Sequence, residues 1–510
     1  MNNDRLAVVC GWEFFRRWWI GVLAISVAAM VPCFWQRHVE AGDLGSHVYN
    51  AWLAQLIGRG EAPGMYLAHQ WHNVLFDFAL LGVAQVAGFL AAEKIVIAVA
   101  VVIFVWGAFA LVAALSGRAP WFLLPCLAML AYGYSFNMGF FNYYISIGLA
   151  SWSLAIFLGG RRGDWVTGLA FLPVIYFAHP IGFVFAAGTM AYVALQRLLP
   201  GFWKAVVPVV VLAAIGVLHW VLATRVDFDV DWTKPGPFYA LNGSDQLVLY
   251  GAQYSALARL AVLFGVICFF VDAVLRRREG WAGWKPFARP AEFYAVALVV
   301  TALLPENLQF TPESAWIGLL VSRLTTISAI FGLALLGCLK PRKWHLAGFA
   351  LVGMVFFLFW NEDQKYLNQV ESNVDALLWN LPYGTRVIPT LAAPPDWRIE
   401  FAGHLADRAC IGHCFAYSNY EAPSGQFRVR ARAGSRIARD SYSEAVDMEG
   451  GTYVFQAEDL PLVQVYQCER GNLLRVCLRE LKVGDRARTF GPKGGQAEEE
   501  PKDDSGDKEQ

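Results

Sequence analysis

Long apolar stretches, separated by short polar connections, fill the first 360 residues of the chain. About 11 of them are long enough, or nearly so, to cross the ~30 Å hydrocarbon core of a bilayer as helices. Because hydrocarbon offers no partner to backbone amides, helices are the ordinary way for such segments to cross. The pattern therefore predicts an α-helical polytopic membrane protein. The expected spans are residues 18–35, 93–115, 120–135, 143–160, 165–178, 181–198, 204–223, 254–275, 291–305, 316–339 and 344–360.

Basic residues around these stretches predict which connections lie in the cytoplasm. Three arginines lie among residues 1–17, which places the N-terminus inside by the positive-inside rule. A further apolar stretch, Val74–Ala92, is not counted as a span, because a span there would place four later basic clusters outside. Its Asp77 and Gln85 are also costly at mid-membrane. We therefore expect an interfacial or re-entrant helix within a first outer loop that covers residues 36–92. The four clusters are Arg118, Arg161–Arg162, Arg276–Arg278 and Lys340–Lys343.

The composition changes sharply after Trp360. A helical pattern covers Asn361–Leu378, and several short runs beyond it have the pattern of strands. Residues 361–487 are therefore expected to form a small α+β domain. An N-terminus inside, followed by an odd number of spans, places this domain outside the cytoplasm. Residues 488–510 are charged, glycine-rich and nearly free of apolar side chains, which is typical of a disordered tail. The expected strands include Pro382–Thr390, Gly451–Phe455 and Leu462–Gln467.

Composition narrows the class of protein further. Hydrophobic residues make up 57% of the chain and charged residues 16%, which excludes an ordinary soluble globular protein. The formal net charge is zero and no domain is basic, so nucleic-acid binding has no support. The sequence has no P-loop, HExxH or GxSxG motif, and no GxGxxG in a strand–helix context, so no ATP-driven step is expected. We expect an integral, multi-pass protein of the cytoplasmic (inner) membrane.

The nine cysteines fall into two groups. Buried thiols are ordinary in the apolar stretches, and five cysteines lie in or near them, namely Cys10, Cys33, Cys126, Cys268 and Cys338. The other four lie in the C-terminal region, namely Cys410, Cys414, Cys468 and Cys477. Four cysteines in an extracytoplasmic domain suggest two disulfides, whose pairing the spacing leaves open. A zinc site that includes His404 and His413 is the alternative.

The loop 36–73 holds the first candidate chemistry. Glu40 and Asp43 lie just past the first span, and His47 follows Asp43 by four positions, on the same face of a predicted helix 44–57. A carboxylate at the partly desolvated mouth of a helical bundle can have a raised pKa and act as a general base. A carboxylate pair could also bind a divalent cation such as Mg²⁺ or Mn²⁺. Asp43 as the N-cap of the helix is the structural alternative.

A second set of candidates lies at the ends of later spans. Arg323 stands about two turns inside an apolar run, where a guanidinium is costly unless it faces a cavity or an anion such as a lipid phosphate. His179, at a helix corner before Pro180, is a candidate of the same kind. Asn142 and Tyr143 belong to a polar outer turn whose amide and phenol groups could hydrogen-bond a substrate. The structural alternatives are an ion pair or snorkelling for Arg323 and helix–helix hydrogen bonds for the turn.

The layout resembles the GT-C class of membrane glycosyltransferases, such as protein O-mannosyltransferases and lipid A aminoarabinose transferases. The shared features are a first span with its N-terminus inside, an acidic outer loop just past it, a juxtamembrane helix, many further spans and a domain outside the membrane. The resemblance covers roughly residues 1–360. It places the loop carboxylate of the family on Asp43, with Glu40 as the second acidic member, the juxtamembrane helix on Val74–Ala92, and the phosphate-binding arginine on Arg323. The spacing EAGD departs from the tight acidic pair usual in the family.

The resemblance implies transfer of a hexosyl or pentosyl group from a polyprenyl-phosphate carrier to an extracytoplasmic acceptor, which could be a glycan, a lipid or a protein. Asp43 would deprotonate the acceptor hydroxyl, and Arg323, with His179, would hold the leaving phosphate. Two other functions stay open. One is a transporter or flippase for a lipid-linked or amphipathic substrate, although the repeat symmetry typical of transporters is not evident. The other is a non-catalytic scaffold that displays residues 361–487.

Overall fold

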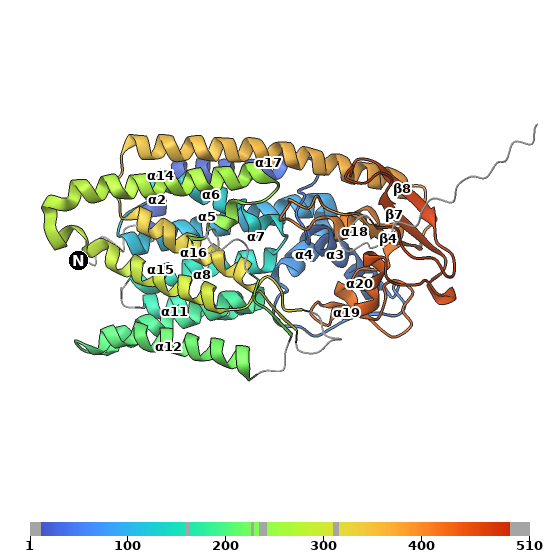
Figure 1. Cartoon of the computed structure of the whole chain (residues 1–510), viewed down its shortest axis with the longest axis horizontal. Helices are drawn as coiled ribbons and strands as arrows, with labels where there is room; N and C mark the ends of the chain where they lie inside the picture. Colours follow the sequence, from blue (N-terminus) through green and yellow to red (C-terminus); the bar gives the residue numbers. More distant parts are fainter. Residues whose placement is uncertain are drawn as a thin grey trace, which may run out of the picture.

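The computed structural model of the chain describes residues 12–159, 161, 163–225, 229–233, 242–309 and 316–489. A bundle of long helices forms one end of the molecule, and a small domain with a sheet forms the other (Figure 1). Cys10 and nearly all of the expected tail at 488–510 lie outside the described residues.

Nine helices among the described residues are long and apolar enough to cross a membrane. Each is at least 18 residues long, about 27 Å at the rise of an α-helix. Some, such as α12, expose apolar side chains over most of their surface, as helices that face lipid do. The chain therefore has the fold of a polytopic helical membrane protein. The nine helices are α2 (Trp12–Met30, continued by the 3-10 turn η1, Val31–Phe34), α5 (Phe89–Ser116), α8 (Phe141–Gly159), α11 (Pro180–Leu198), α12 (Trp203–Thr224), α14 (Ala252–Arg276), α15 (Lys285–Leu303), α16 (Leu320–Gly337) and α17 (Lys343–Leu378).

Two of the predicted spans, 120–135 and 165–178, are broken into short helices and do not belong to this set. In the first, Gly133 is extended and interrupts the helix, and a Cβ there would lie 2.7 Å from the carbonyl oxygen of Gln246. In the second, a new helix starts around Pro173, which cannot continue the preceding ladder of hydrogen bonds. The short helices are η2 (Trp121–Leu123), α6 (Leu124–Ala131), α7 (Tyr134–Asn137), α9 (Asp164–Ala170) and α10 (Leu172–Ala178).

The stretch expected to lie at the membrane interface forms the helix α4 (Leu75–Ala87). Its 13 residues extend about 20 Å, less than the thickness of the hydrocarbon core. Gly88, with φ 79° and ψ 165°, separates α4 from α5, a backbone conformation that is nearly confined to glycine. α4 packs on α5, α8 and α3 (Leu44–Arg59), the helix of the first loop.

The bundle and the C-terminal domain are joined by the single helix α17, which runs along one side of the molecule (Figure 1). Its 36 residues extend about 54 Å. The predicted span 344–360 and the predicted helix Asn361–Leu378 are therefore one element. The sequence explains this, because no proline or glycine lies between Trp360 and Leu378 to end the helix.

The C-terminal domain is built on a four-stranded mixed sheet with the order β5-β4-β7-β8. β4 is parallel to both of its neighbours, and β7 and β8 form an antiparallel pair. The predicted strand Leu462–Gln467 is confirmed, whereas Gly451–Phe455 is not a strand. The strands are β4 (Thr385–Thr390), β5 (Cys414–Ala416), β7 (Leu462–Gln467) and β8 (Val476–Glu480). The helices of this domain are η5 (Ala402–His404), α18 (Leu405–Ala409), α19 (Glu421–Ser424), α20 (Tyr442–Gly450) and η6 (Ala457–Asp459).

Two further strand pairs tie distant segments together. β1 (Met65–Leu67), in the first loop, pairs antiparallel with β6 (Val429–Ala431) of the C-terminal domain. β2 (Asp229–Asp231) pairs antiparallel with β3 (Asn307–Gln309) between helices of the bundle. The first loop thus contacts the C-terminal domain in space, although the residues paired between β1 and β6 are more than 360 positions apart in the chain.

Two pairs of cysteines are at disulfide distance, Cys410 with Cys414 and Cys468 with Cys477. The distances confirm the expected two cysteine pairs and give the pairing that the spacing left open. The first pair links the end of α18 to β5, and the second links β7 to β8. Four of the five cysteines of the apolar stretches are free and buried, as expected, namely Cys33, Cys126, Cys268 and Cys338.

Candidate active site

The backbone of Asp43 is held against the turn between α7 and α8. Its N–H donates to the carbonyl of Met138 at 3.1 Å. Gly139, with φ 79°, permits this approach, because a Cβ there would lie 2.5 Å from the Asp43 nitrogen. Asp43 is the N-cap residue of α3, but its side chain forms no capping hydrogen bond. The side chain is 22% exposed. The capping alternative is therefore wrong, and the carboxylate is open to a ligand.

A histidine of the C-terminal domain faces this carboxylate. His404 Nε2 lies 3.9 Å from Asp43 Oδ1 and 3.4 Å from the hydroxyl of Tyr420. The other ring nitrogen, Nδ1, lies 2.8 Å from Asp407 Oδ2. Burial lowers the pKa of His404, but the hydrogen bond and charge of Asp407, with the charges of Glu421 and Asp43, outweigh it and raise the pKa to about 10. At neutral pH this ring is an imidazolium ion.

Two buried glutamates of the same domain surround the imidazolium ion. Burial raises the pKa of Glu421 to about 7, although the charges of His404 and His47 lower it. Burial likewise raises the pKa of Glu449 to about 8, although the positive charge of His404 lowers it. Glu421 also accepts a short hydrogen bond from the amide of Asn50 on α3. Part of the negative charge at this interface is therefore neutralised by protons near pH 7.

The predicted substrate contacts His47 and Asn142 meet at Asp77, on α4. His47 Nδ1 lies 2.7 Å from Asp77 Oδ1, and Asn142 Nδ2 donates to Asp77 Oδ2 at 3.0 Å. Asn142 Oδ1 also accepts from the N–H of Phe76. His47 is 5% exposed, not a surface residue. Asp77 thus joins α3, α4 and α8, and its place in the apolar helix α4 is explained by its two polar partners.

Arg323 lies on the first turn of α16, not two turns inside the span. Ile317 pairs with Leu308 in an isolated bridge, and Leu319 has a φ of 56°, so the chain before Leu320 is not helical. The Arg323 guanidinium lies over the ring of Phe140, 4.1 Å from its centroid, a cation–π contact. The residue therefore sits at the mouth of the bundle.

The polar contacts of the Arg323 side chain leave part of its donor capacity unused. Nη1 donates to the carbonyl of Gly318 at 3.0 Å. Nε is buried and has no hydrogen-bond partner among the described residues. Of the ionisable neighbours, Asp43 has the largest electrostatic effect on this guanidinium. The structure thus brings Asp43 and Arg323, predicted from segments 280 positions apart, into one electrostatic environment.

Tyr143 and His179 adjoin Arg323 on its other side. The hydroxyl of Tyr143 donates to the carbonyl of Arg323 at 2.5 Å, and its ring meets the His179 ring edge-on at 5.6 Å. His179 Nδ1 accepts from the N–H of Ile181, so the proton of the neutral ring is on Nε2. Burial, with the positive charges of Arg323 and His72, lowers the pKa of His179 to about 3. His179 is a neutral hydrogen-bond donor here, not a cation.

Glu40 is placed in a different, buried ion cluster. Arg408 of α18 bonds Glu40 at 2.8 Å, Glu93 at 3.0 Å and, most closely, Glu371. Glu40 is 3% exposed. Burial and the negative charge of Glu371 raise the pKa of Glu40 well above its usual range, against the effect of Arg408. This placement favours a role in fastening the first loop to α5, α17 and the C-terminal domain.

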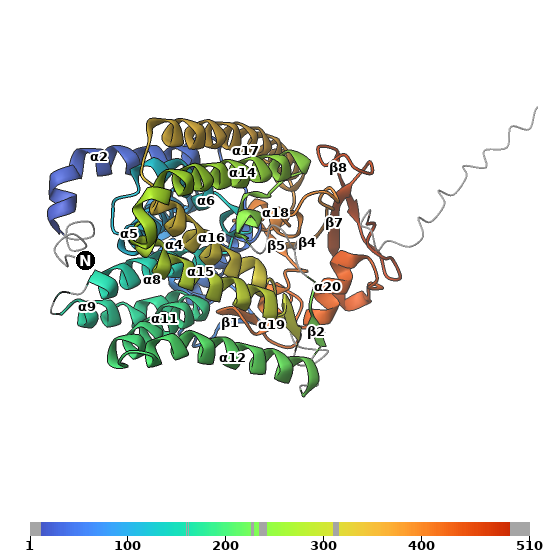
Figure 2. The same cartoon turned by 60° about the vertical axis from the view of Figure 1, so that its left-hand side comes forward.

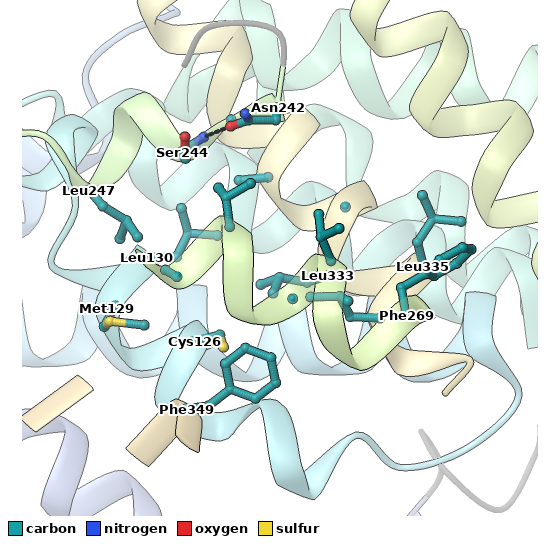
Figure 3. A pocket seen from close by; sticks show the side chains of 18 of the residues that line it. Cys126, Met129, Leu130, Asn242, Ser244, Leu247, Phe269, Leu333, Leu335 and Phe349 are labelled. Carbon is teal, nitrogen blue, oxygen red and sulfur yellow. Dashed lines mark hydrogen bonds between the residues drawn. The ribbon is translucent and has the colours of Figure 1, made fainter. Parts of the chain in front are cut away.

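A cavity of about 310 Å³ lies between α6, α14, α15 and α16, lined almost entirely by apolar side chains (Figure 3). On α16 the lining runs from Ala329 to Leu336, about 9 to 20 Å along the helix from Arg323. Ser244 and Asn242 form a polar rim, and the hydroxyl of Ser244 has no hydrogen-bond partner among the described residues.

Sequence reasoning did not single out Asp407, Tyr420 or Glu421. The sequence carried one signal, His404 and Asp407 at a spacing of three, which puts both on one face of a helix. His404 itself was considered only as a zinc ligand. Tyr420 and Glu421 lie together at the start of α19, and only the fold brings them to α3.

No group of three or more His, Cys, Asp or Glu side chains within the described ranges is arranged to hold a metal ion. The expected Mg²⁺ or Mn²⁺ site therefore stays a prediction without support from these residues. No protein-family model, no curated protein and no solved structure matches this chain.

Proposed function

We propose that the chain is a membrane glycosyltransferase that moves a sugar from a polyprenyl-phosphate carrier to a hydroxyl of an acceptor. The observation that carries the proposal is the electrostatic interaction between a partly exposed carboxylate, Asp43, and an arginine, Arg323, at the mouth of the bundle. One group can take a proton and the other can bind a phosphate, and glycosyl transfer from a lipid phosphate needs both. The GT-C resemblance of the sequence points to the same two residues.

In the proposed reaction, Asp43 removes the proton of the acceptor hydroxyl. The acceptor oxygen uses the freed electron pair to bond the anomeric carbon of the sugar. The bond between that carbon and the phosphate oxygen breaks, and its electron pair stays on the phosphate. The products are the glycosylated acceptor, a polyprenyl phosphate with one more negative charge, and a protonated Asp43 that returns its proton to solvent.

Arg323 suits the leaving phosphate for three reasons. Its guanidinium offers paired donors that match phosphate oxygens. Its ring contact with Phe140 holds the planar group in place. Its buried Nε has no acceptor among the described residues and would gain one from a phosphate. The Nε2–H of neutral His179, near Arg323, is a further donor of the kind that stabilises developing negative charge.

The apolar cavity supports a lipid-linked donor. Its lining on α16 begins at Ala329, about 9 Å from Arg323 along the helix axis and on another face of that helix. An isoprenoid chain is apolar, and this lining offers it van der Waals contact without placing it against polar groups. We assign the cavity to the isoprenoid units nearest to the phosphate.

The test uses the purified full-length protein in nanodiscs, with undecaprenyl phosphates that carry glucose, mannose, galactose or arabinose. Release of undecaprenyl phosphate is measured. Asp43→Asn and Arg323→Ala are each expected to lower the rate at least 100-fold, in the range of a lost general base or charge partner. Asp164→Asn, at the end of the bundle away from the C-terminal domain (Figure 2), is the matched control. Wild-type rates in both folded site variants would contradict the proposal.

A further inference from the structure

Three ionisable groups form a row across the contact between α3 and the C-terminal domain. Asp43 Oδ1 lies 3.9 Å from His404 Nε2, and His404 Nδ1 lies 2.8 Å from Asp407 Oδ2. The exposed fraction of these side chains falls along the row, from 22% for Asp43 to 6% for His404 and 1% for Asp407. The row therefore leads from a ligand-accessible carboxylate into the C-terminal domain.

The orientation of the His404 ring is fixed from the buried end. The Asp407 carboxylate accepts from Nδ1–H of the ring and also from Nδ2 of Asn419 at 3.0 Å. Asn419 Nδ2 in turn lies 3.3 Å from Ser46 Oγ on α3. With Nδ1 committed to Asp407, Nε2 is the nitrogen that points to Asp43 and to the Tyr420 hydroxyl. Second partners of this kind set both the tautomer and the direction of a histidine.

Other charged groups also act on Asp43, from α3, α16 and the C-terminal domain. The cations are His404, His47 and Arg323. The carboxyl groups are Glu400 and Glu421. A positive charge beside a carboxyl group favours its ionised form, which is the form that can act as a base. Of the three cations, His404 approaches Asp43 to within 4 Å.

We propose that His404 is a positioning residue that places a positive charge against Asp43 and holds this carboxylate at the mouth of the bundle, so that the C-terminal domain supplies an obligatory part of the site. This inference rests on the proposed function. His404 does not relay the proton, because the carboxylates on both of its sides already hold the ring as an imidazolium ion. A merely structural histidine would support folding without changing the ionisation of Asp43.

The proposal is tested by the pH dependence of undecaprenyl phosphate release. In His404→Gln the acid limb of kcat/KM is expected to move to higher pH by about one unit or more, because an opposite charge at this distance shifts a carboxyl pKa by one to three units. Activity is then recovered as the pH is raised. Asp407→Asn should move the limb in the same direction. The matched control is His413→Gln in the same domain, whose ring contacts the Leu378 carbonyl, and its profile should match wild type.

Several outcomes would overturn the inference. An unshifted acid limb in folded His404→Gln overturns it, and so does a loss of rate in the folded variant that is the same at every pH. If His404→Gln does not fold, an unshifted limb in Asp407→Asn has the same meaning. The proposed function fails separately, when Asp43→Asn retains the wild-type rate. An inactive Asp43→Asn with an unshifted His404→Gln would leave the function standing and remove only the role of His404.

Discussion

Arg408 Nη2 donates a hydrogen bond to Glu40 Oε2 at 2.8 Å, and this contact joins the C-terminal domain to the first loop. The same guanidinium bonds Glu93 and Glu371, so one cation holds three carboxyl groups that are each no more than 4% exposed. Buried charges of this kind contribute little over a well-packed apolar core, but removing one partner leaves the others uncompensated. The loop that carries Asp43 is therefore fastened by Arg408.

Arg408→Met is expected to lower the free energy of unfolding by about 3–5 kcal/mol, because it removes the guanidinium that three buried carboxyl groups share. Arg37→Met is the control, since its side chain is 65% exposed and its pair with Asp375 at 3.7 Å is expected to contribute at most about 1 kcal/mol. Unfolding of both variants by urea in detergent micelles measures the difference. Equal destabilisation by the two changes would contradict the role of Arg408.

The pair of His47 and Asp77 predicts a dependence of stability on pH. Burial lowers the pKa of His47, but Asp77, Glu421 and Asp43 raise it, and the value is about 9 against 6.5 for an unperturbed ring. Since the folded state holds the proton more tightly, the protonated ring stabilises the fold fully below pH 6.5 and this contribution is lost as the pH rises to 9. The melting temperature of the wild type should fall over that window more than that of His47→Gln. If the melting temperatures of the two proteins fell in parallel between pH 6.5 and pH 9, the predicted contribution of His47 would be refuted.

The two cysteine pairs predict a response to reductant but not to chelator. Reduction removes cross-links that restrict the unfolded chain, and each such cross-link typically contributes about 2–4 kcal/mol. Dithiothreitol should therefore lower the melting temperature of the C-terminal domain, and Cys468→Ser with Cys477→Ser should lower it without reductant. EDTA should have no effect. Loss of stability in EDTA would instead favour the zinc site.

The cavity predicts that filling it weakens donor binding. Gly332→Phe would place a ring among the lining residues, and we expect the KM for the undecaprenyl donor to rise about tenfold, the size of effect given by a lost apolar contact surface. Leu263→Phe is the control, on the outward face of α14 where Leu263 is 55% exposed. Equal KM values for the two folded variants would show that the donor chain binds elsewhere.

The sequence allowed the class of fold and several elements to be predicted, because apolar length and charge placement are local properties. The broken span 120–135 was harder to foresee, since its interruption at Gly133 depends on the carbonyl of Gln246, more than 100 positions away. The prediction of a strand at Gly451–Phe455 was wrong. The segment forms a loop, in which the N–H of Phe455 donates to the Asp485 carbonyl.

The candidate site was predictable only in part. Asp43 and Arg323 could be singled out because a charged group beside or within an apolar run is costly unless it has a partner or a function. Glu40 could be singled out for the same reason. In the structure, however, it accepts a hydrogen bond from Arg408, 368 positions away in the chain. His404 and Asp407 could not be assigned to Asp43 from sequence, because the contact depends on how the C-terminal domain packs on α3.

The most direct measurement is a cryo-EM structure of the full-length protein in nanodiscs with an undecaprenyl phosphate sugar, using Asp43→Asn to prevent turnover. The proposal predicts the phosphate within about 4 Å of the Arg323 guanidinium, the distance of a charge-assisted contact, with the sugar between it and residue 43 and the chain in the cavity beside α16. A donor phosphate bound more than ~15 Å from Arg323 would contradict the proposal, since both groups must act on one reacting centre.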